Sequence, residues 1–140
     1  MVKNLKICLN LNETFIFIKT YMINGLNILI ADDAVSTIEI LQFLLEQEGA
    51  TVSVAENGQI AVEFAKAKHF DIVLMDIQMP VCDGIQATKQ IREFDRETPI
   101  IAVTAASESE ARHFEKYGFD DFFQKPVDFM LLQKKIEQYA

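Results

Sequence analysis

The chain has 140 residues, a length that fits one domain with at most a short extension and excludes a catalytic domain joined to a separate regulatory domain. Half of the residues are hydrophobic, five are glycine and three are proline, so we expect a folded core rather than a disordered chain. The formal net charge is -8, whereas a nucleic-acid-binding surface needs a basic patch or stripe. The composition therefore argues against direct binding of DNA or RNA.

Sorting signals are not evident in the sequence. Lys3 and Lys6 lie near the start, but polar residues interrupt the stretch that follows and no small-residue cleavage site comes after it. No window approaches the ~20 apolar residues of a membrane-spanning helix. We therefore expect a cytoplasmic protein in which Cys8 and Cys82 are reduced and structural, with a disulfide as the less favoured alternative.

Residues 1–26 differ from the rest of the chain, which we assign to one domain, residues 27–140. The extension holds three lysines and one glutamate, which leaves ten basic and twenty acidic residues for the domain. Its apolar residues alternate with polar ones, as in a strand, at Leu5, Ile7, Leu9 and Leu11. Three hypotheses compete: a mis-assigned translation start, a linker remnant of a larger protein, or an added edge strand. We favour the first, with the true start at Met22.

Five short apolar runs recur along the domain and predict β-strands: Asn27–Ala31, Thr51–Ala55, Asp71–Met75, Pro99–Val103 and Phe119–Gln124. The second, third and fourth runs are mostly too apolar for a strand with one wet face. We expect them to be buried on both faces, which is typical of a parallel sheet.

A helical pattern follows each run. The apolar positions are Val35, Ile38, Leu41, Leu44 and Leu45 in the first helix, Ile60, Ala61, Phe64 and Ala65 in the second, Ile85, Thr88 and Ile91 in the third, Ala111 and Phe114 in a weaker fourth, and Phe129, Leu132, Ile136 and Tyr139 in the fifth. Gly49 and Gly118 are placed to end the first and fourth helices, and Asp128 to cap the fifth. Five βα units predict an open, doubly wound α/β domain.

Reactive side chains follow four of the predicted strands. Asp32 and Asp33 come after the first, Asp76 after the third, Thr104 after the fourth and Lys125 after the fifth. Because the functional crevice of an open parallel sheet lies beyond the carboxyl ends of its strands, these five side chains should converge.

The converging groups indicate metal and phosphoryl chemistry. Close carboxylates repel by about 4 kcal/mol per pair at an effective dielectric of ~20, and Mg²⁺ compensates such a cluster with a preference for oxygen ligands. We expect Asp32 and Asp33 to hold the metal and Asp76 to act as a nucleophile through its carboxylate oxygen. Lys125 and the metal would neutralise a transferring phosphoryl group, and the Thr104 hydroxyl could donate to it.

Taken singly, each of these residues has a structural explanation. An Asp after a strand is usually a helix cap or turn residue. Thr104 could cap the helix that follows it, and a Lys before a proline is usually a solvated charge. The joint occurrence at the ends of four strands favours a functional site.

The domain resembles the receiver domains of two-component response regulators, and its motif around Asp76 is similar to that of receivers of hybrid sensor kinases. The segments that show the resemblance are the acidic pair in LIADDA, the segment LMDIQMPVCDG around Asp76, the segment AVTAA with Thr104, and QKP with Lys125. The resemblance implies a CheY-like, flavodoxin-like fold with strand order 2-1-3-4-5.

The resemblance also implies roles for these residues. Asp76 would accept a phosphoryl group from a phosphohistidine on a histidine kinase or phosphotransfer protein. Asp32, Asp33, Asp76 and the backbone carbonyl of Gln78 would bind Mg²⁺, with Mn²⁺ as an alternative ion. Thr104 and Phe122 would form the switch pair, and Gln78 and Ala106 lie where the family tunes the phosphoryl lifetime.

The implied output is a changed protein-binding surface on the fourth helix, fifth strand and fifth helix. Such a domain would catalyse only its own phosphorylation and dephosphorylation, as a monomer or a phosphorylation-linked dimer, without binding nucleic acid or membrane. Two other functions remain: a Mg²⁺-dependent aspartyl-phosphate phosphohydrolase, disfavoured because Gln78 stands where such enzymes carry a second acid, and a receiver-like scaffold that binds partners without phosphorylation. His69 and His113 have no ligand partners at suitable spacing, and we expect both at the surface or the edge of the core.

Overall fold

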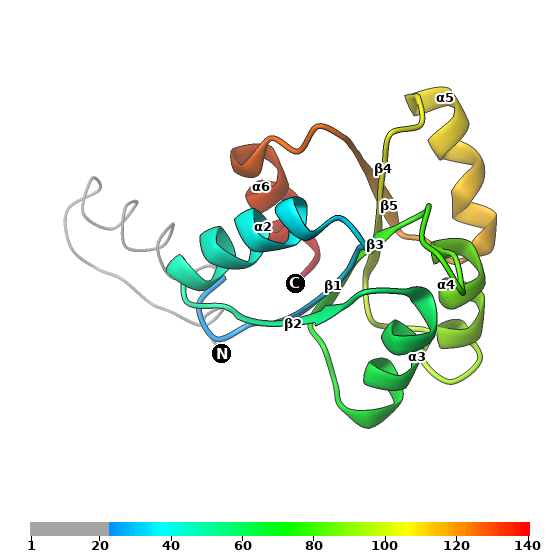
Figure 1. Ribbon diagram of the computed structural model, residues 1–140, viewed down its shortest axis with the longest axis horizontal. Helices are drawn as coiled ribbons and strands as arrows, with labels where there is room; N and C mark the ends of the chain where they lie inside the picture. Colours follow the sequence, from blue (N-terminus) through cyan, green and yellow to red (C-terminus); the bar gives the residue numbers. More distant parts are fainter. Residues whose placement is uncertain (1–22) are drawn as a thin grey trace.

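The computed structural model describes residues 23–140, and the element labels are those of Figure 1. The strands of this part of the chain are β1 (Asn27–Ala31), β2 (Thr51–Ala55), β3 (Ile72–Asp76), β4 (Ile100–Thr104) and β5 (Asp121–Gln124). Its α-helices are α2 (Val35–Gln47), α3 (Gly58–Ala67), α4 (Gly84–Arg92), α5 (Glu108–Ala111) and α6 (Phe129–Tyr139), and a 3₁₀-helix, η2 (Arg112–Tyr117), follows α5.

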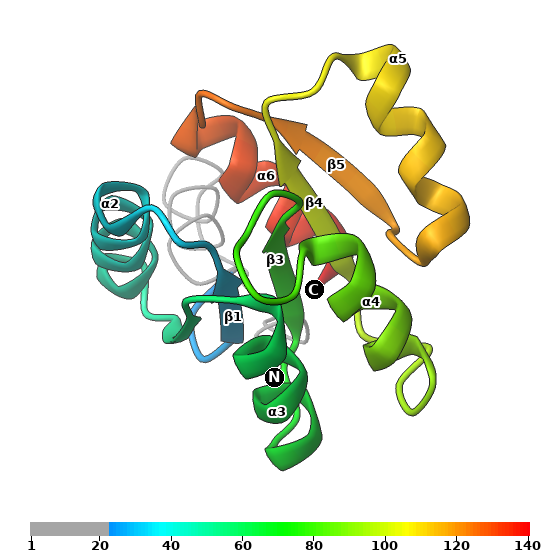
Figure 2. The ribbon, with the colours of Figure 1, turned by 45° about the vertical axis from the view of Figure 1, so that its right-hand side comes forward.

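The strands form one parallel sheet in the order β2-β1-β3-β4-β5. Helices α2 and α6 pack on one face, and α3, α4 and the α5–η2 segment pack on the other (Figure 2). Each face buries its own cluster of aliphatic and aromatic side chains. The predicted doubly wound α/β fold with strand order 2-1-3-4-5 is confirmed.

The burial of the strands corrects one prediction. The run Thr51–Ala55 is not buried on both faces: Thr51 is exposed and the next three residues are half-buried, because β2 lies at the edge of the sheet. The strand β1 lies inside the sheet instead, and four of its five residues are buried. All residues of β3 and β4 are buried, as predicted. Both strands are shifted by one residue from the predicted bounds, and β5 begins two residues later than predicted.

Side-chain caps and glycine set the helix ends. The carboxylate of Asp128 accepts hydrogen bonds from the N–H groups two and three residues further on, which confirms it as the cap of α6. Gly49 follows α2 with φ +90°, in the left-handed region that favours glycine after a helix. In α2 the predicted apolar stripe is buried at Ile38, Leu41 and Leu45, whereas Val35 is exposed.

The predicted fourth helix consists of two pieces. A single α-helical turn, α5, continues as the 3₁₀-helix η2, which ends at Gly118 with φ +109°. Ala111 is the one buried residue of α5, and η2 has none. Most helical stability in proteins comes from the packing of an apolar face. The apolar stripe of this segment is weak, and the segment therefore does not form a long regular helix.

The chain before β1 contributes to the core. Ile23 and Leu26 are buried in the cluster under α2 and α6, and the Gly25 N–H donates to the Gly49 carbonyl at 2.9 Å. These residues fall within the predicted extension 1–26. Residues 1–22, with Cys8 and the hypothesised start at Met22, lie outside the described residues, so the division at residue 27 stays a prediction. Among the described helices, none is long and apolar enough to cross a membrane.

The start of α4 packs tightly against the end of β3. Asp83 caps this helix in a capping box with Gln86 and brings Gly84 against the backbone of Asp76. The Gly84 N–H donates to the Ile77 carbonyl at 3.0 Å, and a side chain at Gly84 would overlap the carbonyl of Asp76. A glycine is therefore required where α4 meets the last residue of β3.

We expect Gly84→Ala to lower the free energy of unfolding by about 1–3 kcal/mol, because the added methyl group overpacks a rigid backbone contact. Urea denaturation followed by circular dichroism measures this loss. Glu63→Ala, an exposed change in α3, is the control and should stay within about 0.5 kcal/mol of the wild type. Equal stabilities of the two variants would contradict the tight contact.

Candidate functional site

The predicted site residues meet at the carboxyl ends of the strands. Asp32 and Asp33 follow β1, Asp76 ends β3, Thr104 ends β4 and Lys125 follows β5. Ala31 pairs with Met75 in the parallel register of β1 and β3, so the next residue of each strand places a carboxylate beside its neighbour. The sheet thus brings together the five side chains that the sequence singled out.

Three carboxylates form the acidic part of the site. One oxygen atom from each of Asp32, Asp33 and Asp76 lies within 4.8 Å of the others. Asp32 and Asp76 are 2% and 6% exposed, whereas Asp33 is exposed. The Ala34 N–H donates to Asp32 Oδ1 at 2.8 Å, and the Gln78 N–H donates to Asp76 Oδ1 at 3.3 Å. Backbone amides therefore hold one oxygen of each buried carboxylate.

Lys125 lies between the two buried carboxylates. Its Nζ is 3.2 Å from Asp32 Oδ2 and 3.3 Å from Asp76 Oδ2. The Lys125 N–H donates to the Thr104 carbonyl at 2.8 Å, which fixes the start of the lysine side chain beside the end of β4. The following peptide bond, to Pro126, is cis. Lys125 is thus an ion-pair partner of the site rather than a solvated loop charge.

Burial and like charge perturb the acidic groups. Burial, followed by the neighbouring charge of Asp32, raises the pKa of Asp76 above its ordinary value, although Lys125 partly opposes the shift. Burial alone would lower the pKa of Lys125, but the charges of Asp32 and Asp76 raise it above its ordinary value. The lysine therefore stays protonated, and a single ammonium faces two buried carboxylates and an exposed one.

The donor set fits a hard divalent cation. Three carboxylates with oxygen atoms this close supply the oxygen ligands that Mg²⁺ takes from proteins, and an exposed Asp33 leaves the cluster open for bound water. The position of Gln78 next to this cluster is consistent with a further backbone ligand, and its carbonyl stays a prediction.

Thr104 and Phe122 lie on the same face of the sheet. In the register of β4 and β5, Ala102 is opposite Phe122 and Thr104 is opposite Gln124, so alternate residues place both members of the predicted switch pair toward α4 and η2. The Thr104 hydroxyl accepts from the Ala106 N–H at 3.1 Å. Thr104 does not cap the next helix, because Ser107 does so.

Cys82 and the two histidines are not members of this cluster. Cys82 is buried, and burial raises the pKa of its thiol, in agreement with a structural role. His69 and His113 are exposed. Two features had no signal in the sequence: Val81, in the loop after the site, has φ +70°, and Lys135 of α6 donates to the Phe122 carbonyl at 3.0 Å.

Comparisons with known proteins agree with this geometry. Residues 28–137 match the family described as "Response regulator receiver domain". The sensor protein GacS of Pseudomonas syringae pv. syringae is 42% identical over 106 residues, which make up 71% of this chain and 12% of GacS. The chain therefore spans only a small part of that relative.

Two solved structures share the fold. The receiver domain of the sensor histidine kinase PA1611 from Pseudomonas aeruginosa PAO1, with a magnesium ion coordinated in its active site cleft, has a TM-score of 0.77 and 31% identity and covers 82% of this chain and 97% of its own. A chain in the co-crystal structure of the Saccharomyces cerevisiae histidine phosphotransfer signaling protein Ypd1 with the receiver domain of Ssk1 has a TM-score of 0.78 and 33% identity, covering 84% and 90%.

The pKa of Asp76 leads to a test of the site's electrostatics. A carboxyl whose pKa is raised by folding destabilises the protein above that pKa, and the penalty disappears as the pH falls below its ordinary value of 3.8. Without divalent metal, Asp76→Asn should therefore raise the melting temperature at pH 7, and the gain should shrink as the pH approaches 4.

Asp121→Asn should change the stability at pH 7 in the opposite direction. Burial alone would raise the pKa of Asp121, but hydrogen bonds from Phe122, Tyr139 and Lys135 lower it below its ordinary value. This variant should be less stable than the wild type at pH 7, with the deficit lost as the pH falls through the lowered pKa. Thermal melts in chelator measure the two trends, between pH 4 and 7 for Asp76→Asn and on to pH values below 3.8 for Asp121→Asn, because the lowered pKa of Asp121 lies under that ordinary value. A destabilised Asp76→Asn at pH 7 would contradict the assigned electrostatics.

Proposed function

Because the chain belongs to the response regulator receiver domain family, we propose that its acidic site accepts a phosphoryl group on Asp76 from a phosphohistidine in a Mg²⁺-dependent reaction. Receiver domains are the phosphoacceptors of two-component phosphorelays, and this chain is one of them. The observation that carries the assignment to Asp76 is its position: it is a buried carboxylate at the end of the central strand β3, with Lys125 within 3.3 Å and the acidic pair beside it.

Asp32, Asp33 and Asp76 would hold the metal, with the Gln78 carbonyl as a further ligand. When bound, Mg²⁺ supplies positive charge to the equatorial oxygens of the transferring phosphoryl group, and Mn²⁺ could replace it. The PA1611 receiver, which holds magnesium in its active site cleft, supports this proposal.

The chain's own residues carry the transfer. A carboxylate oxygen of Asp76 attacks phosphorus, the bond from phosphorus to the donor's imidazole nitrogen breaks, and that nitrogen keeps the bonding electrons. Lys125 exchanges its contact with Asp76 for one with a phosphoryl oxygen and stabilises the developing charge. The domain would catalyse only this step and the later hydrolysis of its own aspartyl phosphate.

Phosphorylation would change a protein-binding surface through Thr104 and Phe122. The Thr104 hydroxyl turns from the Ala106 amide to a phosphoryl oxygen. The Phe122 ring then moves into the space that the Thr104 side chain leaves, on the face of the sheet where both residues lie. The surface of α5–η2, β5 and α6 is thereby repacked for a downstream protein. Couplings of about 1–3 kcal/mol are typical of such two-state devices. The domain would act in the cytoplasm, as a monomer or a phosphorylation-linked dimer.

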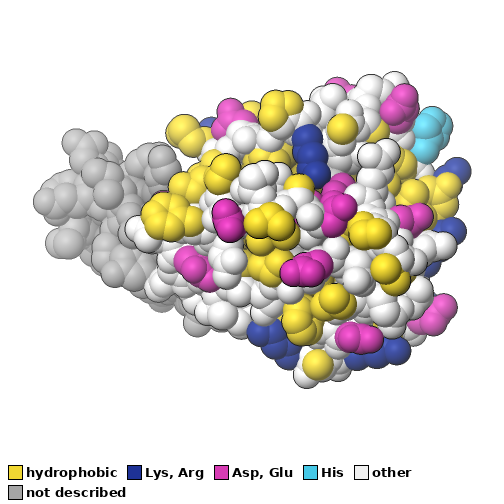
Figure 3. Space-filling model, viewed as in Figure 1, with side chains coloured by type: hydrophobic (Ala, Val, Ile, Leu, Met, Phe, Trp, Pro, Cys, Tyr) yellow, Lys and Arg dark blue, Asp and Glu magenta, His cyan; other side chains and the backbone are white. Residues whose placement is uncertain are grey.

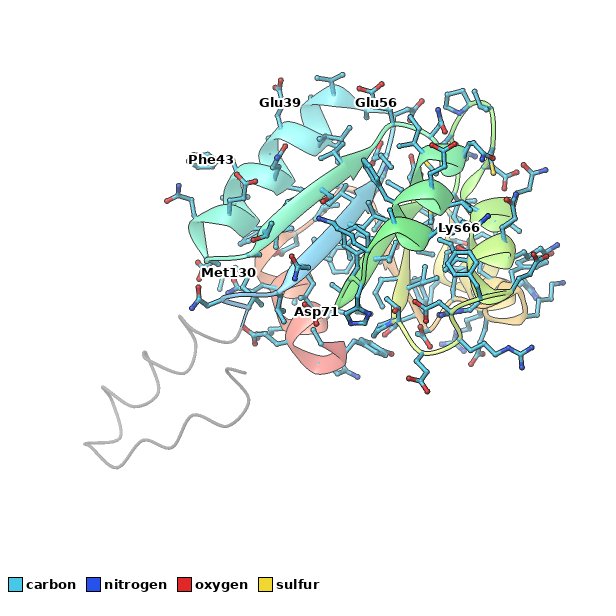
Figure 4. The ribbon with its side chains drawn as sticks, turned by 90° about the horizontal axis from the view of Figure 1, so that it is seen from below. Glu39, Phe43, Glu56, Lys66, Asp71 and Met130 are labelled. Carbon is cyan, nitrogen blue, oxygen red and sulfur yellow. The ribbon has the colours of Figure 1, made fainter. Side chains whose placement is uncertain are left out.

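The phosphodonor would dock on an apolar surface beside the site. Ile40 and Phe43 of α2 are 60% and 61% exposed, and Figure 4 shows Phe43 pointing outward from this helix. A groove of about 220 Å³ runs between α2 and the segment after β5, and its lining includes Ile40, Leu44, Lys125 and Phe129. Figure 3 shows hydrophobic side chains spread over this face among acidic ones.

Lys125 lines this groove and also contacts Asp76, so the groove lies beside the phosphoryl site. A protein that brings phosphohistidine to Asp76 must cover the rim of the site, where this apolar surface lies. We assign it to a histidine kinase or phosphotransfer protein with an apolar helical face around its histidine. The complex of Ypd1 with the Ssk1 receiver supports such a partner.

Phosphorylation should be visible by intact mass spectrometry after incubation with acetyl phosphate. We expect an adduct with the mass of one phosphoryl group in Mg²⁺ or Mn²⁺, none in chelator, and none in Asp76→Asn. An adduct that persists in Asp76→Asn would assign the phosphoryl group to another residue. Multiple turnover of an organic phosphate monoester would instead favour the phosphohydrolase. The absence of any adduct would favour the scaffold that binds partners without phosphorylation.

The donor surface predicts a difference between large and small donors. The protein donor for this test is the phosphotransfer domain that phosphorylates the wild type fastest. Phe43→Ser should slow phosphoryl transfer from this donor by about tenfold, a typical loss for an interface aromatic. It should leave the rate with acetyl phosphate unchanged. Phe94→Ser, at an exposed aromatic outside this surface, is the matched control. Equal rates from the protein donor in both variants would place docking elsewhere.

A further inference from the structure

Lys135 connects α6 with the aromatic residue of the proposed switch. Its Nζ donates to the Phe122 carbonyl at 3.0 Å and lies 5.6 Å from the centre of the Phe122 ring and 6.0 Å from that of Phe123. It also pairs with Asp121 Oδ2 at 3.1 Å. One ammonium thus contacts three successive residues of β5.

The position of β5 makes this contact unusual. β5 is an edge strand, and successive side chains of a strand point to opposite faces. Phe123 packs in the cluster under α2 and α6, whereas Phe122 packs against the cluster under α3 and α4. Lys135 belongs to α6 but touches the ring on the other face, so it must reach around the free edge of the sheet.

Side chains also satisfy the backbone of Phe122. Its N–H donates to Asp121 Oδ1 at 2.7 Å, and its carbonyl accepts from Lys135. Tyr139 of α6 donates to Asp121 Oδ2 at 2.9 Å and so holds the same carboxylate that pairs with Lys135. The groups that fix Phe122 at the edge therefore come from β5 itself and from α6.

We propose that Lys135 is a positioning residue that holds the Phe122 ring in the orientation seen here and ties its rotation to α6. This proposal rests on the proposed function, because it assumes that Phe122 turns toward Thr104 when Asp76 is phosphorylated. The inward turn removes the ring from the ammonium, while the carbonyl bond and the Asp121 pair keep Lys135 on β5. Lys135 thereby opposes activation.

Trifluoroberyllate with Mg²⁺, which mimics an aspartyl phosphate, tests this in the full chain. Lys135→Met keeps the aliphatic stem but loses the charge, and we expect it to bind trifluoroberyllate about two- to fivefold more tightly, the equivalent of one exposed cation–π contact. Lys135→Arg should restore the wild-type affinity. Lys134→Met, an exposed neighbour on the same helix, is the control and should have no effect.

Ring signals give a readout that a loss of general stability would not move. With ¹³C-labelled phenylalanine and Phe122→Leu for assignment, the Phe122 signal of unliganded Lys135→Met should shift toward its trifluoroberyllate-bound position. Lys135→Gln keeps a donor for the Phe122 carbonyl without the charge and should behave like Lys135→Met. If it behaves like the wild type, the carbonyl bond is what matters and the ring contact is overturned.

The outcomes separate this proposal from the function on which it rests. If the wild-type chain binds no trifluoroberyllate, or if Asp76→Asn binds it as tightly as the wild type does, the phosphoacceptor assignment is refuted. A wild type that binds normally, with Lys135→Met unchanged in both affinity and ring signal, refutes only the role of Lys135. Should Lys135→Met fail to fold, Lys135→Gln carries the same comparison.

Discussion

Asp32 and Asp76 are buried beside each other, and their mutual repulsion is the constraint around which the rest of the site is arranged. Two charges about 4 Å apart repel by ~4 kcal/mol at an effective dielectric of ~20, and burial raises the pKa of Asp76 further. Lys125 offsets part of this repulsion through contacts with both carboxylates. The exposed Asp33 adds a third charge that the lysine does not balance. The described side chains of the site thus carry a local excess of negative charge, which a divalent cation would have to balance before a negatively charged phosphoryl group could approach.

The strand order makes this arrangement possible. β1 and β3 are neighbours, so the residues after Ala31 and Met75 place their carboxylates side by side. β5 is separated from β3 by β4, and only a long side chain can span that distance from its end. Lys125 does so while its N–H is held by the Thr104 carbonyl. Gly84 then allows α4 to pack against the backbone of Asp76, the residue that carries the carboxylate.

The sequence predicted the site better than it predicted the surfaces around it. The site follows from strand ends, and strand ends are visible as apolar runs followed by Asp, Thr or Lys. The burial of β2 on both faces was wrong, although the predicted strand order already places β2 at the edge of the sheet and Thr51 and Ser53 alternate with valines, a pattern typical of a half-exposed strand. Lys135 could not have been found in this way. A lysine on a helix is usually solvated, and its contact with Phe122 depends on how α6 sits against the edge of the sheet.

An edge strand is a suitable place for the switch residue that we propose, Phe122. In an inner strand both sides of the backbone are paired with neighbouring strands, and displacing a residue breaks hydrogen bonds on both sides. Phe122 has β4 on one side only, and its own N–H and carbonyl are satisfied by the side chains of Asp121 and Lys135. Side chains can follow a moving backbone more readily than a strand can. The same two residues also lie on the surface that we propose for a downstream protein, so a partner that binds Asp121 or Lys135 would change how firmly Phe122 is held. By the reciprocity of coupled equilibria, such a partner would also change the stability of the phosphorylated state.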